Sequence, residues 1–256
     1  MRGRRSSRAP IATAVVRLTD VAPDGTSAQV TAGILNLTHR GSHADPSPLE
    51  TGVATEMRVP MRGTAYRFLA GHRIRVSIAS ASWPAIWPAP YEAEYALHLA
   101  GAAGSEGSRL VLPTIPGGGS ALPAPPFKTT AAGLREIGRY SAERPTWRVT
   151  EDVIDGSVTV SSSEAGERST SDGRLTLYTS ERFEMTARDD DPADARMSNE
   201  VVYRSRGHGS EVLVEASGTI QSTATDFHLD VGLNVTLDGA PFFQRSWVET
   251  IPRRLV

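Results

Sequence analysis

Hydrophobic and polar residues alternate along much of this chain, which is typical of β-strands that bury one face. The longest alternation covers residues 227–237, where six hydrophobic residues are separated by polar residues or glycine. Shorter alternations cover residues 57–61, 73–78, 95–99 and 183–187. Because successive side chains of a strand point to opposite faces, each segment is predicted to have one dry face and one wet face.

Short turn sequences separate these segments. Asp238-Gly239 follows the longest alternation, and both residue types tolerate the positive φ of a tight hairpin, which predicts a return strand over 242–250. Helical periodicity is scarce: it predicts one short helix over 131–140 and a turn or two over 191–197. The chain is therefore predicted to be all-β, an antiparallel β-sandwich or jelly roll with few short helices. Further turn signals precede strands expected near 28–31, 158–160 and 175–178: Pro23-Asp24-Gly25, Asp155-Gly156 and Asp172-Gly173.

The domain organisation is predicted to be simple. Residues 1–11 are interpreted as a disordered basic tail, and residues 12–256 as a single β-sandwich. Residues 113–126 are rich in Pro and Gly and form a candidate surface connection. This connection either divides two subdomains or joins two halves of one sandwich, with late strands pairing back into the first half. We favour the second alternative, because the first half alone has few strands.

Composition narrows the range of functions. The 256 residues are 39% hydrophobic and 22% charged, as in soluble globular proteins, and there is no cysteine. The formal net charge of −2 argues against a nucleic-acid partner. No apolar run is long enough for a membrane span, and residues 11–18 are too short and too polar for the core of a signal peptide. We expect a cytoplasmic protein without a membrane partner.

No catalytic residue is predicted. The closest match to the Gly-x-Ser-x-Gly nucleophile elbow of α/β-hydrolases covers residues 103–107, but its first residue is Ala and no helix follows it. Residues 207–210 contain a His and a Ser between glycines, yet they lack the spacing and the strand-to-helix setting. Both segments are interpreted as turns.

Metal binding has only weak candidates, and no cofactor is expected. The six histidines are scattered, and His39 and His43 have zinc-ligand spacing only in a loop close to prolines. Asp189, Asp191 and Glu200 could occupy ligand positions of a calcium loop, but the residues between them break the pattern. A solvated acidic loop, or a helix start with Asp near its N-terminus, is the favoured interpretation.

The aromatic segment 83–88, WPAIWP, is the strongest surface candidate. Proline stiffens it, and the indoles of Trp83 and Trp87 provide a large contact area, which suits a docking interface. Together with Tyr91 they could also form a platform for a sugar. A third interpretation is that the tryptophans cap one end of the sandwich core.

Several segments in order resemble one family, the C-terminal domain of the X-Pro dipeptidyl-peptidase and cocaine-esterase group of serine α/β-hydrolases. The resemblance is densest over residues 17–113 and returns over 191–256. The segments that carry it are RLTDVAPDG (17–25), GILNLTHR (33–40), Pro48-Leu49, FLAGHRIR (68–75), WP (83–84 and 87–88), residues 243–247 and IPRRLV (251–256).

The resemblance implies a jelly-roll domain similar to galactose-binding modules, which packs beside the catalytic domain. The family's Ser-Asp-His triad belongs to that other domain, so this chain alone is predicted to be inactive. It would support a dipeptidyl-peptidase or esterase only by docking to a catalytic domain or chain, with Arg73, Arg75 and the tryptophan loop as candidate contacts. The alternative is a free-standing carbohydrate-binding module that uses Trp83 and Trp87. The oligomeric state is left open.

Overall fold

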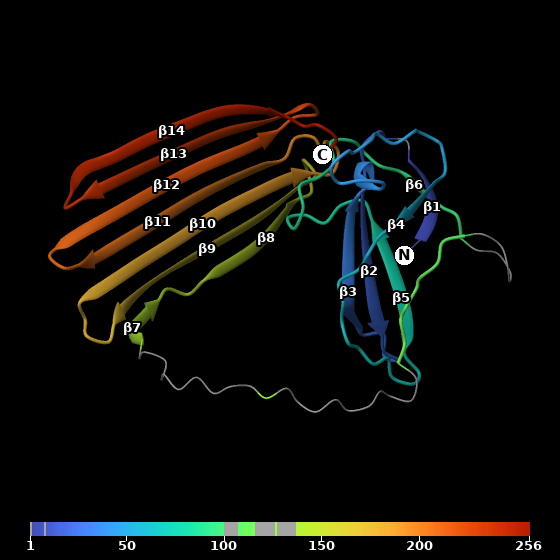
Figure 1. Cartoon of the computed structure of the whole chain (residues 1–256), viewed down its shortest axis with the longest axis horizontal. Coiled ribbons are helices and arrows are strands. Elements are labelled where there is room, and N and C mark those ends of the chain that lie inside the picture. Colours follow the sequence, from blue (N-terminus) through green and yellow to red (C-terminus); the bar gives the residue numbers. More distant parts are fainter. Residues whose placement is uncertain (1, 8, 100–106, 116–125, 127–136) are drawn as a thin grey trace.

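The chain folds into β-sheets, as seen in a computed structural model that describes residues 2–7, 9–99, 107–115, 126 and 137–256 (Figure 1). In this part of the chain the strands are antiparallel within three sheets, and a 3-10 helix, η1 (Leu37–His39), is the only helical element. The predicted all-β class is therefore confirmed. Among the described residues there is no helix with the length and hydropathy needed to cross a membrane.

Two three-stranded sheets form the N-terminal part of the molecule. Their strand orders are β4-β1-β6 and β3-β2-β5. Crossover connections occur in both sheets, because β2 pairs with β5 and β1 pairs with β4 and β6. The strands are β1 (Arg2–Ser7), β2 (Thr13–Val21), β3 (Ser27–Asn36), β4 (Thr55–Arg58), β5 (Arg73–Ala79) and β6 (Tyr95–Leu97).

The core of the N-terminal part lies between these two sheets. Ala14 and Val16 of β2 are fully buried, and Met57 of β4 packs into the same cluster. Gly33 of β3 is required by this packing: a Cβ there would lie 2.2 Å from the Pro60 carbonyl oxygen. The other buried members of the cluster are Ala12, Leu35, Leu37, Leu49 and Val59.

The C-terminal part is one large antiparallel sheet with the order β14-β13-β12-β11-β10-β9-β7, and β8 also pairs with β9. From β9 to β14 each strand pairs with the next one in the sequence, so this sheet is a meander (Figure 1). The strands are β7 (Ile137–Ala142), β8 (Thr146–Asp152), β9 (Ser157–Thr170), β10 (Leu175–Arg188), β11 (Arg196–Gly207), β12 (Ser210–Ser222), β13 (Asp226–Leu237) and β14 (Ala240–Pro252).

The two faces of the large sheet differ in chemistry. The registers place the hydrophobic residues of the sequence alternation on one side, and most charged and hydroxyl side chains on the other. We call the first side the apolar face. Its members on β10 to β13 include Leu177, Phe183, Met185, Met197, Val201, Tyr203, Val212, Val214, Ala216, Ile220, Leu229, Val231, Leu233, Val235 and Leu237.

Most of the predicted strands and turns agree with the structure. The alternation over 227–237 is β13, and Asp238 and Gly239 take φ values of 51° and 78° in the hairpin to β14. The predicted strand over 73–78 is β5, although Ile74 on its expected dry face is 50% exposed. The turns at Gly25, Gly156 and Gly173 have positive φ, as their residue type allows.

Other parts of the sequence interpretation differ from the structure. Residues 2–7 form β1 instead of a tail, because β4 and β6 supply partners for their backbone groups on both sides. The described late strands pair with one another and not with the first half, since short turns bring each one beside its neighbour in sequence. Residues 137–140 begin β7, residues 131–136 lie outside the described part, and residues 191–195 lead into β11 without a helix.

Candidate functional site

The tryptophan loop, residues 83–90, lies between β5 and β6 and joins the N-terminal part to the large sheet. The rings of Trp83 and Trp87 meet edge to face with centroids 5.7 Å apart, and Trp87 makes the same kind of contact with Phe227 of β13 at 5.8 Å. The indole N–H of Trp87 donates a hydrogen bond of 2.9 Å to Ser222 Oγ at the end of β12. Trp87 is therefore a structural contact between two parts of the fold.

Ser222 is 1% exposed and organises the loop that precedes β11. Its hydroxyl donates to the Ala193 carbonyl oxygen at 2.6 Å and accepts from the Ala195 amide at 3.3 Å. A buried hydroxyl with all its partners in place holds the Trp87 indole in one position. No local sequence pattern predicts this contact, because Ser222 is 135 residues from Trp87.

The two indoles do not form an exposed platform. Trp83 and Trp87 are both partly buried, and the Trp83 Nε1 is enclosed without a hydrogen-bond partner in the structure. Tyr91 is 40% exposed, but it lies beyond the loop. A sugar platform needs aromatic faces that are open to solvent, so this arrangement agrees better with the capping interpretation of the tryptophans.

Arg253 closes the same junction and is only 6% exposed. Its guanidinium donates to the carbonyl oxygens of Pro88 at 2.6 Å and Thr223 at 3.0 Å, and it lies over the Phe227 ring at 4.8 Å. Burial lowers the pKa of the Arg253 guanidinium, although Tyr91 opposes this shift. The burial of Arg253 has no local signal in the sequence, because the tryptophan loop that covers it is far away in the chain.

The chain end also reaches the N-terminal part. The Leu255 carbonyl oxygen accepts hydrogen bonds from Asn36 Nδ2 at 2.7 Å and from Thr38 Oγ1 at 2.9 Å. Together with Trp87 and Phe227, Asn36 and Arg253 line a small cavity of about 170 Å³. The junction between the two parts is thus composed of a few aromatic and polar contacts.

Arg73 and Arg75, the other predicted docking residues, lie on β5, an edge strand of its sheet among the described residues. Both are exposed. Arg75 is held in place by hydrogen bonds from Nε to Thr19 Oγ1 at 3.2 Å and from Nη2 to Ser27 Oγ at 2.6 Å. Arg75 therefore presents a positioned positive charge on an open sheet edge.

A polar cluster beside this edge was not predicted. Asp20 of β2 is 4% exposed, and its carboxylate accepts from the Tyr66 hydroxyl at 2.8 Å and faces His72 Nδ1 at 2.9 Å. The hydrogen bond to Asp20 raises the pKa of the Tyr66 hydroxyl, and burial acts in the same direction. In the sequence, Asp20 is only one residue of the segment RLTDVAPDG (17–25), and the pairing of β2 with β5 brings His72 to it.

The candidate metal ligands are not gathered into a site. Asp190 pairs with Arg188, while Asp189 and Asp191 are engaged through their backbone groups in the loop between β10 and β11. Glu200 is the register partner of Arg182 within the sheet. Over the whole described part of the chain, no group of three or more His, Asp or Glu side chains could hold a metal ion.

The remaining sequence candidates have structural roles or lie outside the described residues. His208 and Gly209 form the β11–β12 hairpin turn, with φ values of 56° and 83°. His39 and His43 lie near each other, with ring centroids 5.5 Å apart, in and after η1. Most of the elbow-like segment 103–107 falls in the part that the structure does not describe.

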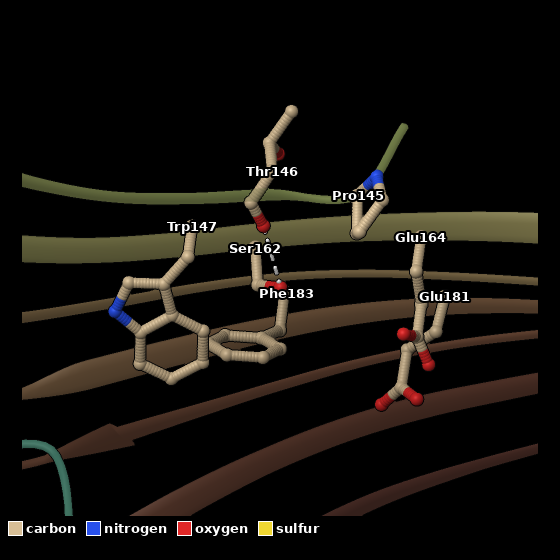
Figure 2. A pocket seen from close by; sticks show the side chains of 7 residues that line it. All are labelled: Pro145, Thr146, Trp147, Ser162, Glu164, Glu181 and Phe183. Atoms are coloured by element: carbon tan, nitrogen blue, oxygen red, sulfur yellow. Dashed lines mark hydrogen bonds between the residues drawn. The ribbon is translucent and has the colours of Figure 1, made fainter. Parts of the chain in front are cut away.

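One hollow lies on the apolar face of the large sheet (Figure 2). Trp147 of β8 and Phe183 of β10 meet edge to face at 5.6 Å along one side, and Trp147 is 63% exposed. Glu164 and Glu181 are direct register partners on β9 and β10, so two carboxylates lie beside each other at the other side. The hollow has a volume of about 400 Å³, and Pro145, Thr146 and Ser162 complete its lining.

The N-terminal part of the chain is similar to a known family of domains. Residues 1–112 match the family model of the X-Pro dipeptidyl-peptidase C-terminal non-catalytic domain. These residues contain β1–β6 and the tryptophan loop, and they end before the large sheet. The resemblance to the C-terminal domain of this hydrolase group is thereby confirmed.

A relative of known activity also matches part of the chain. The chain is 35% identical over 68 residues to the cocaine esterase of Rhodococcus sp. (strain MB1 Bresler). The matched stretch is 27% of this chain and 12% of the relative, so this chain matches only a small share of that longer protein.

Proposed function

We propose that this chain is the non-catalytic docking module of a serine hydrolase of the X-Pro dipeptidyl-peptidase and acyl-esterase type. The match of residues 1–112 to the non-catalytic domain of this group carries the proposal. The module supports hydrolysis by packing beside a catalytic α/β-hydrolase domain and performs no chemistry itself. The edge strand β5 with Arg73 and Arg75 is the proposed contact to that domain.

Two structural features support β5 as the contact. Among the described residues β5 is an edge strand, and the outer backbone N–H and C=O groups of an edge strand can pair with another chain. Arg75 is already ordered by Thr19 and Ser27, so little side-chain entropy is lost when it meets an acidic surface.

The first test is the activity of the pure chain. We expect no turnover of a p-nitrophenyl ester or of an X-Pro p-nitroanilide above that of heat-denatured protein. Turnover that a serine-directed reagent blocks would contradict the proposal.

The second test exchanges matched segments. The 68 residues of the Rhodococcus cocaine esterase that align with this chain are replaced by the aligned 68 residues of this chain. We expect the chimera to fold and to keep esterase activity, because the two stretches occupy equivalent positions in the proposed module. Residues 182–249 of the large sheet, which have the same length, serve as the control insert and are expected to abolish activity. Equal loss with both inserts would refute the proposed equivalence.

A further inference from the structure

Among the described residues, no second layer covers either face of the large sheet. Within the described ranges, the buried hydrophobic cluster lies entirely in residues 12–95. On the apolar face Trp147, Tyr203 and Phe243 are 63%, 54% and 46% exposed, and the hydrophobic residues between them are only partly buried. A sheet with one apolar face is ordinarily covered by another layer.

The size of the face is that of a protein interface. Six strands about 4.8 Å apart and about twelve residues long give a surface of roughly 1,000 Å². Stable protein–protein interfaces bury about 800 Å² on each partner. The N-terminal part leaves this face open, since it contacts the sheet at one end, through Ser222, Phe227 and Arg253, and lies beyond that end (Figure 1).

The charges on the apolar face indicate what covers it. One row of register partners crosses the six long strands from β9 to β14. Its first two members are acidic, its three central members are apolar, and its last member is basic. In order the row is Glu164, Glu181, Val201, Ala216, Leu233 and Arg245.

This row is complementary to itself. A two-fold axis that runs parallel to the strands between two stacked sheets places β14 of one copy over β9 of the other, at the same level along the strands. Arg245 of each copy then meets Glu164 and Glu181 of the other. An axis across the strands would instead place Arg245 on Arg245, so the charges select the first arrangement.

The neighbouring row agrees with this arrangement. Trp247 is two residues after Arg245 on β14, and the Arg245 guanidinium lies over its ring at 4.8 Å. Trp247 is the last member of the neighbouring row of register partners. In order from β9 to β14 this row is Ser162, Phe183, Asn199, Gly218, Val231 and Trp247. The same two-fold axis therefore brings Trp247 of the second copy to the hollow beside Trp147 and Phe183, with Arg245 next to the two glutamates (Figure 2).

We propose that two copies of this chain associate through the apolar faces of their large sheets, with Arg245 and Trp247 of each copy seated in the Trp147–Phe183–Glu164–Glu181 hollow of the other. The product is a β-sandwich of two aligned sheets. Both N-terminal parts lie at the same end of this dimer. The proposal does not depend on the docking function, because the large sheet lies outside residues 1–112.

The test is sedimentation velocity of the full chain between about 1 and 100 µM. We expect a species of twice the 27.4 kDa chain mass. Arg245→Glu should raise the dissociation constant at least tenfold, because it places like charges opposite Glu164 and Glu181, and the double variant Glu164→Arg/Glu181→Arg should do the same. The matched control is Arg182→Glu/Glu200→Arg, a reversed register pair on the other face, which should dimerise like the wild type.

The decisive measurement mixes the two disrupted variants. Arg245→Glu and Glu164→Arg/Glu181→Arg have complementary charges when they face each other, so they should form a heterodimer that is at least tenfold tighter than the homodimer of either variant. The proposal is wrong if the wild type is monomeric at 100 µM, or if Arg245→Glu leaves the dimer unchanged. It is also wrong if the two variants form no heterodimer although circular dichroism shows that both are folded. One further result would overturn the proposal: a monomer whose apolar face is protected from hydrogen exchange only when a hydrolase domain is added. That result would show that the hydrolase domain covers the apolar face.

Discussion

At the scale of single residues, polar contacts at the N-terminal part depend on pairs that are distant in the sequence. Asp20 is 52 residues from His72 and 46 residues from Tyr66, and the three meet only because β2 and β5 pair. A carboxylate that is 4% exposed needs such partners, because its charge is poorly solvated. These residues therefore stabilise the edge that carries Arg73 and Arg75.

The hydrogen bond from Tyr66 to Asp20 predicts a pH effect. The Asp20 carboxylate favours the neutral hydroxyl and raises the pKa of Tyr66 above the ordinary value for tyrosine. The stabilisation by this pair is fully present below the tyrosine pKa of the unfolded chain and is lost as the pH rises through the higher pKa of the folded state.

Asp20→Asn should lower the Tyr66 pKa. The measurement is an ultraviolet difference titration between proteins with and without Tyr66→Phe, which isolates this hydroxyl from the other tyrosines. The prediction fails if the Tyr66 titration is the same with Asp and with Asn at position 20.

At the scale of elements, hairpins between strands that are adjacent in the sequence form most of the large sheet. Each hairpin from β9 to β14 joins strands that are adjacent in sequence, and the alternation sets which side chains share a face. The β13–β14 hairpin shows this most clearly, because the turn residues Asp238 and Gly239 have the positive φ values that such a turn requires. Asp238 Oδ1 also accepts a hydrogen bond of 2.7 Å from the Glu211 backbone amide, which connects the turn to the start of β12.

Gly239→Ala should therefore destabilise the large sheet by about 1 kcal/mol, because a φ of 78° strains any residue with a Cβ. Chemical denaturation followed by far-ultraviolet circular dichroism measures this change. Gly232→Ala is the control in the same hairpin, since its Cβ would make only an ordinary contact at 3.5 Å with Ser217. Equal effects of the two substitutions would contradict the argument.

At the scale of the whole molecule, two parts with different architecture meet at a small junction. The N-terminal part has its own hydrophobic core, and the large sheet contacts it through Trp87, Phe227, Arg253 and the chain end. The Arg253 side chain donates three hydrogen bonds to backbone carbonyl oxygens: the bond to Pro88 crosses the junction, and the bonds to Thr223 and Val256 stay within the C-terminal part. The buried guanidinium therefore ties the tryptophan loop to the end of the large sheet, beside the Trp87–Ser222 and Leu255 hydrogen bonds.

Arg253→Ala should destabilise this junction by about 3 kcal/mol, because it leaves the carbonyl oxygens of Pro88 and Thr223 without their side-chain donor. In scanning calorimetry we expect the unfolding of the two parts to separate into better-resolved transitions. Arg254→Ala, the exposed neighbour, is the control and should leave the thermogram unchanged. A wild-type thermogram for Arg253→Ala would show that the junction does not rely on this side chain.

The sequence alone determined the β class, strand segments within β9, β10, β13 and β14 of the large sheet, and the hairpin at Asp238-Gly239, because alternation and turn residues act over short distances. The family resemblance noted in the sequence agrees with the family model that matches residues 1–112. Tertiary structure decided that residues 2–7 pair with β4 and β6, that the Trp87 indole donates to Ser222, and that Arg253 is buried. It also brought Glu164, Glu181 and Arg245 into one row of the sheet. These features depend on residues far apart in the chain, whose proximity follows from strand pairing and packing and has no local pattern in the sequence.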